Sequence, residues 1–315
     1  MQALLIYNPN AGAINNHHLE PEDITDALRE AGYYPVYHAT EQEDDLDEIL
    51  KDAQGLVVSA GGDGTLRAVA TRLVGRGIPI APLPMGTANN ICRALEVTRD
   101  PLEIIAALGQ PVRCRFDVGM VCFPWGKEYF LEAMGFGFYA DALAAYRPEN
   151  GKSVARSISS LLDTLRNFQP HPCQISMDGR ELSGQYLNVE ILNTDSFGPR
   201  IKITPEAHFD DGLLDVVLIR PDERDSVLDY ITQLIKGDLI SLPGVQDTRG
   251  RRLDFRWEGW YPLHLDGEVR PQGFKASPED ASGARMATIA GEAKVTVEAL
   301  PGAVEFWLPH PAKKD

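Results

Sequence analysis

The stretch LVVSAGGDGTLRAVATRLV, residues 56–74, decides the fold of the first part of the chain. Residues 56–60 form an apolar run, as expected of a central parallel strand that is covered on both faces. Residues 66–74 then place apolar side chains at the i, i+3, i+4, i+7 spacing of an amphipathic helix, which Gly75 ends. The glycine-rich segment GGDGT, residues 61–65, separates the two. The stretch therefore predicts a strand–turn–helix unit of a parallel sheet.

The same alternation of strand and helix continues over the first 110 residues. Asp100 followed by Pro101, with an acid at Glu103, is typical of a helix N-terminus. Further strands are predicted at residues 3–7 and 33–38, and helices at residues 21–31, 46–53 and 101–109. Repeated units of this kind predict an α/β domain with a doubly wound parallel sheet.

The pattern changes after residue 111. Residues 112–118 alternate polar and apolar side chains, and residues 173–184 are typical of a hairpin that turns at Asp178-Gly179. Further strands are predicted at residues 213–220, 253–257, 294–300 and 304–308, and helices at residues 153–168 and 225–236. We therefore predict an α/β domain over residues 1–111, a mainly antiparallel β domain over residues 112–292, and C-terminal strands at residues 293–315 that return to the first domain.

Composition and charge restrict the partners and the location. The chain has 315 residues, 46 acidic and 30 basic, and a formal net charge of −16. No nucleic acid is expected as a partner, because phosphate contacts need a concentrated basic surface. No apolar run reaches the roughly 18 residues of a membrane span, and the N-terminus lacks the basic region of a signal peptide. We expect a cytoplasmic protein without a transmembrane segment.

Cysteine and histidine spacing does not indicate a zinc site. The four cysteines contain no CxxC pair, and His17 and His18 are adjacent rather than one helical turn apart. We expect reduced cysteines that pack as small apolar residues, and the two histidines on a surface loop.

Three glycine-containing turns follow strands and are candidates for phosphate binding. In GGDGT the glycines would let the backbone approach a phosphate closely, while Thr65 offers a hydroxyl and Asp63 a carboxylate for magnesium. NPNAG at residues 8–12 and PMGTANN at residues 84–90 follow neighbouring strands. Each turn alone would also serve as an ordinary strand-to-helix connection. Because the carboxyl ends of parallel strands share one edge, the three together predict a nucleotide site.

These motifs, followed by DDGLLDV at residues 210–216 and DGE at residues 266–268, resemble the diacylglycerol kinase catalytic-domain family. That family includes soluble bacterial lipid kinases and the sphingosine and ceramide kinases. The resemblance covers nearly the whole chain. GGDGT alone is shared with NAD kinases and phosphofructokinases, so the two late motifs make the likeness specific.

The resemblance implies a two-domain kinase that binds ATP and Mg²⁺ in an interdomain cleft and phosphorylates a lipid hydroxyl, such as that of a diacylglycerol. Glu268 would be the general base, with Asp266 beside it. A structural metal site would use the Asp211 carboxylate and the backbone carbonyls of His208 and Leu213. The residues implied for ATP are Asn8, Thr40, Gly61, Gly62, Asp63, Gly64, Thr65, Leu66, Arg67, Gly86 and Thr87.

The chain also departs from the family pattern. Ala11 stands where many members have Ser, and Arg67 and Ala68 replace Asn and Glu. Asn90 and Tyr139 stand where Asp is common, so that, together with the Glu replaced by Ala68, three acidic groups are missing near the expected cleft. The sequence does not specify which lipid is the acceptor.

Two alternatives to a lipid kinase remain. One is a NAD-kinase-like activity, and the other is a catalytically weak protein of the same fold that binds lipid or nucleotide. A lipid kinase would meet its substrate peripherally, at the inner membrane face. The candidate docking residues are Arg249, Arg251, Arg252 and Arg256, or Lys152, Arg156 and Arg166, and ordinary solvated charge explains both groups equally well.

Overall fold

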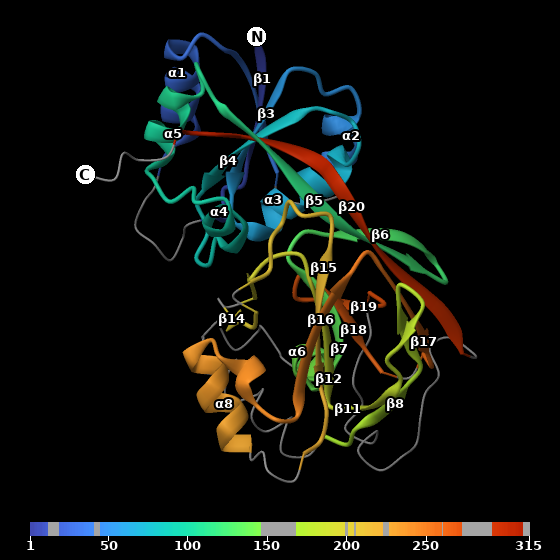
Figure 1. The fold of residues 1–315 in the computed structure, drawn as a ribbon. Coiled ribbons are helices and arrows are strands. Elements are labelled where there is room, and N and C mark those ends of the chain that lie inside the picture. Colours follow the sequence, from blue (N-terminus) through green and yellow to red (C-terminus); the bar gives the residue numbers. More distant parts are fainter. Residues whose placement is uncertain are drawn as a thin grey trace. The chain divides into compact units, whose positions relative to one another are not determined.

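The computed structural model describes residues 1–11, 19–40, 45–145, 168–198, 201–204, 206–222, 227–259, 261–272 and 292–310 (Figure 1). The chain divides into two compact units. Unit 1 is Met1–Val118 with Pro301–Asp315, and unit 2 is Gly119–Leu300. Gly12, the pair His17 and His18, residues 153–167 of one predicted helix and the first two residues of the helix predicted at 225–236 lie outside the described residues.

Unit 1 contains the predicted parallel sheet. Its strands run in the order β4 (Pro79–Pro84), β3 (Leu56–Gly61), β1 (Gln2–Tyr7) and β2 (Tyr34–Ala39), and every neighbouring pair is parallel. All six residues of β3 are buried, as its apolar sequence predicts for a central strand. The helices are α1 (Pro21–Glu30), α2 (Asp45–Lys51), α3 (Asp63–Leu73), α4 (Asn90–Ala94) and α5 (Pro101–Ala107).

Local capping explains where the helices of unit 1 begin. Pro21 opens α1, and its N-cap residue Glu20 exchanges hydrogen bonds with Asp23 in a capping box. At α5 the Leu102 N–H donates to the Asp100 carboxylate (2.9 Å), one residue after Pro101. The helix starts predicted from these residue types are therefore confirmed.

Unit 2 is mainly antiparallel β. Its six-stranded sheet runs in the order β16 (Val245–Gly250), β15 (Leu214–Ile219), β12 (Asn188–Leu192), β7 (Ala133–Gly137), β18 (Leu263–Leu265) and β19 (Glu268–Arg270). A second series of paired strands is β10 (Arg180–Glu181), β9 (Ile175–Met177), β17 (Arg252–Trp257) and β20 (Ala293–Leu308). The remaining elements are β5 (Val112–Phe123), which begins in unit 1, and β6 (Gly126–Phe130), α6 (Phe138–Ala145), β8 (His171–Cys173), β11 (Gly184–Tyr186), β13 (Ser196–Phe197), β14 (Ile201–Lys202), α8 (Val227–Lys236) and the short 3₁₀ helix Leu239–Ser241.

The core of unit 2 lies between these two layers of strands. Phe136 of β7 stacks on Phe255 of β17 with ring centroids 4.8 Å apart. Trp257 is fully buried, and its Nε1–H donates to the Tyr261 carbonyl (2.9 Å). The predicted fold class, a doubly wound α/β domain followed by a mainly antiparallel β domain, is confirmed.

Two strands run from one unit into the other. The division between the units falls within β5 and within β20, whereas the predicted boundaries lie at residues 111/112 and 292/293. Residues 305 and 306 of β20 pair in parallel with β4 of unit 1.

The prediction of separate strands at 294–300 and 304–308 is wrong, because β20 is one strand of 16 residues. The dipeptide Pro301-Gly302 is typical of a turn and favours a break there. Instead Gly302, at φ +57°, donates its N–H to the buried Asp117 carboxylate (2.7 Å), which supports the backbone at that point.

All four cysteines are free, as predicted. In the part of the chain that the structure describes, no helix is both long and apolar enough to cross a bilayer.

Candidate functional site

The carboxyl ends of the parallel strands in unit 1 carry the predicted nucleotide residues (Figure 1). Asn8 follows β1 and donates its backbone N–H to the Ala60 carbonyl of β3 (3.0 Å). Thr40 follows β2, is buried, and donates its N–H to the Tyr7 carbonyl (2.9 Å). The parallel register therefore brings residues from three separate loops to one edge of the sheet.

A side-chain hydrogen bond joins the first loop to GGDGT. The Asn8 Nδ2–H donates to Thr65 Oγ1 (3.0 Å) across 57 positions of sequence. Thr65 accepts in this bond, so its own hydroxyl hydrogen can be directed elsewhere. Gly61 lies so close to Thr65 that a Cβ there would be 2.5 Å from its side chain, which explains the first glycine of the motif.

GGDGT and PMGTANN are packed against each other. Met85 N–H donates to the Gly61 carbonyl (2.9 Å), and a Cβ on Gly86 would be only 2.5 Å from the Gly62 Cα. The Asp63 carboxylate accepts a hydrogen bond from Ile91 N–H (3.2 Å) in the first turn of α4. Glycines are needed here because two backbones meet without space for a side chain.

The members of the predicted ATP set differ in accessibility. Gly64 is exposed, and a Cβ on it would meet no atom within 4 Å. Thr87 is exposed as well. Leu66 and Arg67 are buried, with 3% and 7% of their surface exposed, so a contact of Leu66 with a nucleotide would have to be made by its main chain. The N-terminus of α3, which starts at Asp63, would supply free N–H groups for an anion.

The DGE motif of unit 2 forms a tight turn between β18 and β19. Asp266 and Gly267 have φ of +46° and +78°, as in a type I′ hairpin turn. The Asp266 carboxylate accepts hydrogen bonds from three successive backbone N–H groups, of Leu131 (2.9 Å), Glu132 (2.8 Å) and Ala133 (3.0 Å). Asp266 therefore fixes the turn to the segment that leads into β7.

Glu268 is the more accessible carboxylate of this motif. Its side chain is 45% exposed, and Arg270 Nη2 lies 3.3 Å from its Oε2. Arg270 is in turn held by Glu128, whose Oε2 is 2.6 Å from Arg270 Nε. This chain of contacts orients Glu268 while leaving its side chain partly exposed to solvent.

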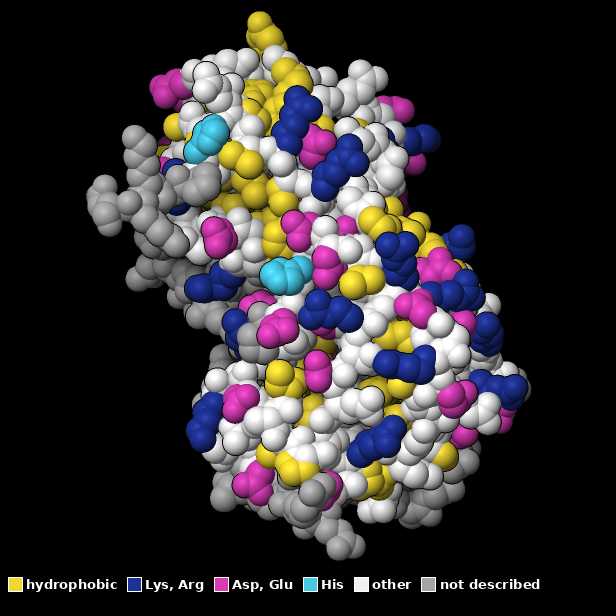
Figure 2. All heavy atoms as spheres, in the orientation of Figure 1, with side chains coloured by type: hydrophobic (Ala, Val, Ile, Leu, Met, Phe, Trp, Pro, Cys, Tyr) yellow, Lys and Arg dark blue, Asp and Glu magenta, His cyan; other side chains and the backbone are white. Residues whose placement is uncertain are grey.

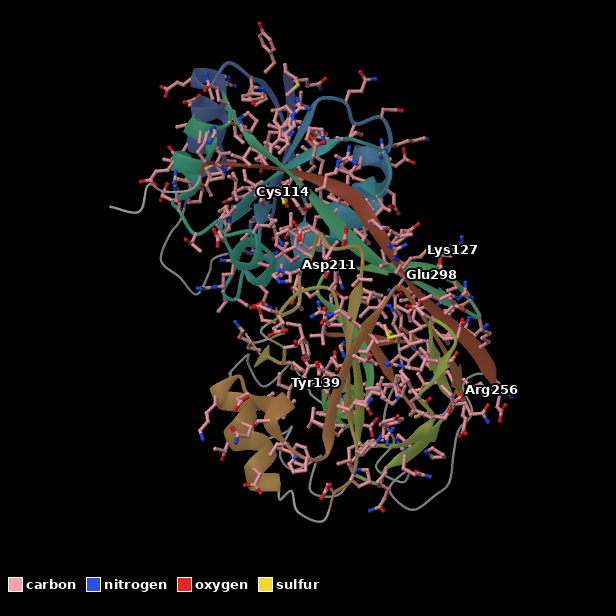
Figure 3. All side chains as sticks on the ribbon, in the orientation of Figure 1. Cys114, Lys127, Tyr139, Asp211, Arg256 and Glu298 are labelled. Carbon is pink, nitrogen blue, oxygen red and sulfur yellow. The ribbon has the colours of Figure 1, made fainter. Side chains whose placement is uncertain are left out.

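The predicted metal residues lie in the loop that leads into β15. The carboxylate of Asp211, which Figure 3 labels, accepts a hydrogen bond from Leu213 N–H (2.9 Å), and His208 is exposed. Burial raises the pKa of Asp215 to about 6, an effect that the nearby Arg249 opposes. Among the described residues no three acidic, histidine or cysteine side chains are placed to hold a metal ion together. The predicted metal set is of another kind, with a single carboxylate and two backbone carbonyls.

The two motifs of unit 2 reach the same end of the six-stranded sheet. Asp266 N–H donates to the Ala133 carbonyl (2.7 Å), Ala133 pairs with Leu192, and Leu192 pairs with Asp215. At about 4.8 Å per strand, the DGE turn and the start of β15 are separated by about 14 Å.

A buried polar cluster beside the DGE hairpin was not predicted. Gly135 on β7 is the register partner of both Glu190 on β12 and His264 on β18. The Glu190 carboxylate and the His264 imidazole approach to 2.8 Å, and a Cβ on Gly135 would be 2.6 Å from that carboxylate. Tyr139 packs edge-on to His264 at 4.9 Å (Figure 3). The sequence feature that could have indicated this cluster is Glu190 within the apolar run NVEIL, because a buried acid requires a partner.

Most of the described docking candidates are already paired with acids. Arg252 contacts Glu298 (2.5 Å), and Arg256 contacts Glu292 (2.7 Å). Figure 2 shows basic and acidic side chains interspersed over unit 2 on the side in view. The second group, Lys152, Arg156 and Arg166, lies outside the described residues.

Comparison with known proteins gives matches over both units. The family described as diacylglycerol kinase catalytic domain matches residues 2–121, and the family described as YegS C-terminal NAD kinase beta sandwich-like domain matches residues 139–282. A protein named "Diacylglycerol kinase" from Bacillus subtilis (strain 168) is 26% identical over 282 residues, which cover 85% of this chain and 89% of the relative.

A protein named "Probable lipid kinase YegS-like" from Pseudomonas aeruginosa (strain UCBPP-PA14) is 34% identical over 264 residues, 80% of this chain and 85% of the relative. The crystal structure of a diacylglycerol kinase from Bacillus anthracis str. Sterne matches with a TM-score of 0.63 and 17% identity, over 99% of this chain and 97% of that one. The structural likeness shows a shared fold.

Proposed function

Because the chain belongs to the diacylglycerol kinase catalytic-domain family of kinases, we propose that it is an ATP- and Mg²⁺-dependent lipid kinase. It would transfer the γ-phosphoryl group of ATP to the hydroxyl of a diacylglycerol or a related lipid. The lipid would be met at a membrane surface, by peripheral contact.

The observation that carries this proposal is the packing of the three loops at the carboxyl edge of the parallel sheet. The side-chain hydrogen bond from Asn8 to Thr65 and the close approach of the Gly62 and Gly86 backbones hold the three loops together. Glycine-containing loops next to a helix N-terminus suit a chain of phosphates, because their N–H groups donate and their glycines allow close approach. Gly64 leaves open space there that a phosphate could fill.

In the proposed reaction Glu268 accepts the proton of the lipid hydroxyl while the hydroxyl oxygen forms its bond to the γ-phosphorus. The bond from that phosphorus to the bridging oxygen of ADP breaks, and ADP leaves with the electron pair. Asp266 has a positioning role, because its carboxylate already accepts hydrogen bonds from three backbone N–H groups. Arg270 holds the Glu268 side chain in place.

Two places for a divalent cation belong to the proposal. Asp63 would face the magnesium that accompanies ATP, where the ion neutralises phosphate charge. Asp211, with the carbonyls of His208 and Leu213, offers the oxygen ligands that magnesium prefers. The separation of about 14 Å from the DGE turn, estimated from strand spacing, suits a structural role for this second position.

The direct test is phosphoryl transfer from radiolabelled ATP to a panel of diacylglycerol, monoacylglycerol, ceramide and sphingosine in mixed micelles, with magnesium or with EDTA. Label should appear in one or more lipids only with magnesium, and Glu268→Gln should lower the rate of labelling by about 10²–10⁴-fold. With NAD added as a further acceptor, label in NADP instead of lipid would support a NAD-kinase-like activity. Binding of ATP without transfer to any acceptor would support a binding protein.

A further inference from the structure

Arg249 lies among three carboxylates, two in the loop that leads into β15 and one at the start of β15 itself. Its guanidinium nitrogens are 3.4 Å from Asp215, 3.9 Å from Asp211 and 4.0 Å from Glu206. Arg249 and Asp215 are also direct partners across the β15–β16 pair. The strand register therefore places Arg249 opposite Asp215 and beside the loop. This placement is set by the backbone pairing and not by the conformation of the arginine side chain.

The surroundings of Arg249 are strongly acidic. Asp210 and Asp211 are adjacent in the loop, and Asp247 lies two residues before Arg249 on β16. The Asp215 side chain is only 9% exposed, whereas that of Arg249 is 42% exposed. A nearly buried carboxylate is costly without a positive charge nearby, because its charge has lost the solvation of water. Arg249 supplies that charge from within the fold.

Asp211 is at the same time the charged member of the proposed metal site. One of its oxygens accepts the N–H of Leu213, and the other faces Arg249 at 3.9 Å. A divalent cation bound at Asp211 would therefore stand within a few ångströms of a guanidinium. Two positive charges at that separation repel each other even in water, and the repulsion doubles when one of them is divalent.

We propose that Arg249 is a tethered competitor of the divalent cation at this loop: its guanidinium neutralises Asp211 and Asp215, and it thereby lowers the affinity of the loop for Mg²⁺. The proposal rests on the metal position of the proposed function but not on phosphoryl transfer. A chain with a neutral residue at position 249 should bind the cation more tightly, and its loop should then depend on the cation for stability.

The test measures Mg²⁺ binding by calorimetry to the full-length protein without nucleotide. Arg249→Gln should bind Mg²⁺ about tenfold more tightly than the wild type, because one unit of positive charge is removed within a few ångströms of the cation in a solvent-exposed loop. Arg251→Gln, a neighbouring arginine for which no ion pair is found among the described residues, is the matched control and should leave the affinity unchanged. Equal affinities of the wild type and Arg249→Gln, or no measurable binding by that variant, would overturn the proposal.

A double variant shows where the added cation binds. In Arg249→Gln/Asp211→Asn the gain should disappear, and a gain that persists would place the ion elsewhere and refute the role of Arg249. Thermal unfolding provides a second measurement: Mg²⁺ should raise the midpoint of Arg249→Gln by more than that of the wild type. If Arg249→Gln does not fold, Arg249→Lys replaces it. Its single ammonium cannot contact three carboxylates in the same way, so about a threefold gain is expected, and no gain would count against the proposal.

None of these outcomes depends on the lipid. A protein that binds Mg²⁺ as expected but phosphorylates no acceptor would retain the inference on Arg249 and lose the proposed function. A lipid kinase in which Arg249→Gln changes no Mg²⁺ affinity would retain the function and lose the inference.

Discussion

Replacement of Gly64 by alanine separates a ligand role of GGDGT from a structural one. Gly64 is the second residue of α3, is exposed, and has room for a methyl group, since a Cβ there would meet nothing within 4 Å. Alanine is better than glycine in a helix by about 0.5–1 kcal/mol, and less in the first turn. We therefore expect Gly64→Ala to raise the thermal midpoint slightly, by about 1–2 °C.

The same methyl group should weaken nucleotide binding. If the open space at Gly64 receives a phosphate, the methyl group displaces it from at least one backbone N–H. A hydrogen bond to a charged group contributes about 1.5–3 kcal/mol, so the Kd for ATP should rise about tenfold to a hundredfold. Calorimetric titration with Mg·ATP, together with thermal unfolding, measures both effects on one sample. A Gly64→Ala protein that binds ATP as tightly as the wild type would refute the phosphate position.

Two other glycines serve as controls. Gly86→Ala should lower both stability and ATP affinity, because its Cβ would be 2.5 Å from the Gly62 Cα and backbone cannot move aside cheaply. Gly109 follows α5 and also has nothing within 4 Å of a Cβ. Gly109→Ala should therefore leave ATP affinity unchanged. Only the combination of increased stability and decreased affinity at Gly64 identifies a ligand contact.

Single side chains give three further predictions. Glu268→Gln should lower kcat by about 10²–10⁴-fold with nearly unchanged ATP affinity, and a variant that retains a third of the wild-type turnover would exclude Glu268 as the base. Gly135→Ala should lower the thermal midpoint of unfolding by several degrees, because the added Cβ would be 2.6 Å from both the Glu190 carboxylate and the Val189 carbonyl. An unchanged midpoint would contradict that close packing. Burial raises the pKa of Asp141 from 3.8 to about 7. The folded state therefore binds a proton more tightly than the unfolded state, and the stability of the fold should decrease as the pH rises from about 4 to 7. Asp141→Asn should therefore be more stable relative to the wild type at pH 8 than at pH 5 in chemical denaturation, and a pH-independent difference would exclude this linkage.

The helices and strands of unit 1 were predictable because residues close together in the sequence determine them. A continuous apolar run with a helical stripe after it specifies a strand–turn–helix unit wherever it occurs, and β3 with α3 is such a unit. The Asp100-Pro101 start of α5 likewise depends on neighbours in sequence. Once the strands are known to be parallel, their carboxyl ends must share an edge. The convergence of the nucleotide loops follows from that geometry.

Unit 2 was less predictable because its determinants are pairings between distant strands. Glu190 and His264 meet only because both are register partners of Gly135, and no local pattern specifies that register. The same holds for Arg249, which reaches the loop before β15 through its pairing with Asp215. At Pro301-Gly302 the local turn signal was even misleading, since a bond from residue 302 to Asp117, 185 positions away, supports a continuous strand.

The two departures from the family pattern next to GGDGT have a different meaning in the folded protein than in the sequence. Along the chain, Ala68 and Asn90 stand for acidic groups missing from the expected cleft. Both are buried in unit 1, with 2% and 1% of their surface exposed. Asn90 precedes Ile91, whose N–H donates to the Asp63 carboxylate. An aspartate at position 90 would place a second negative charge in a buried environment close to that bond, which costs more than a neutral amide of the same size. With Asn90 in place Asp63 has no like-charged neighbour at that position, and in the proposed reaction it can act alone toward the magnesium that accompanies ATP.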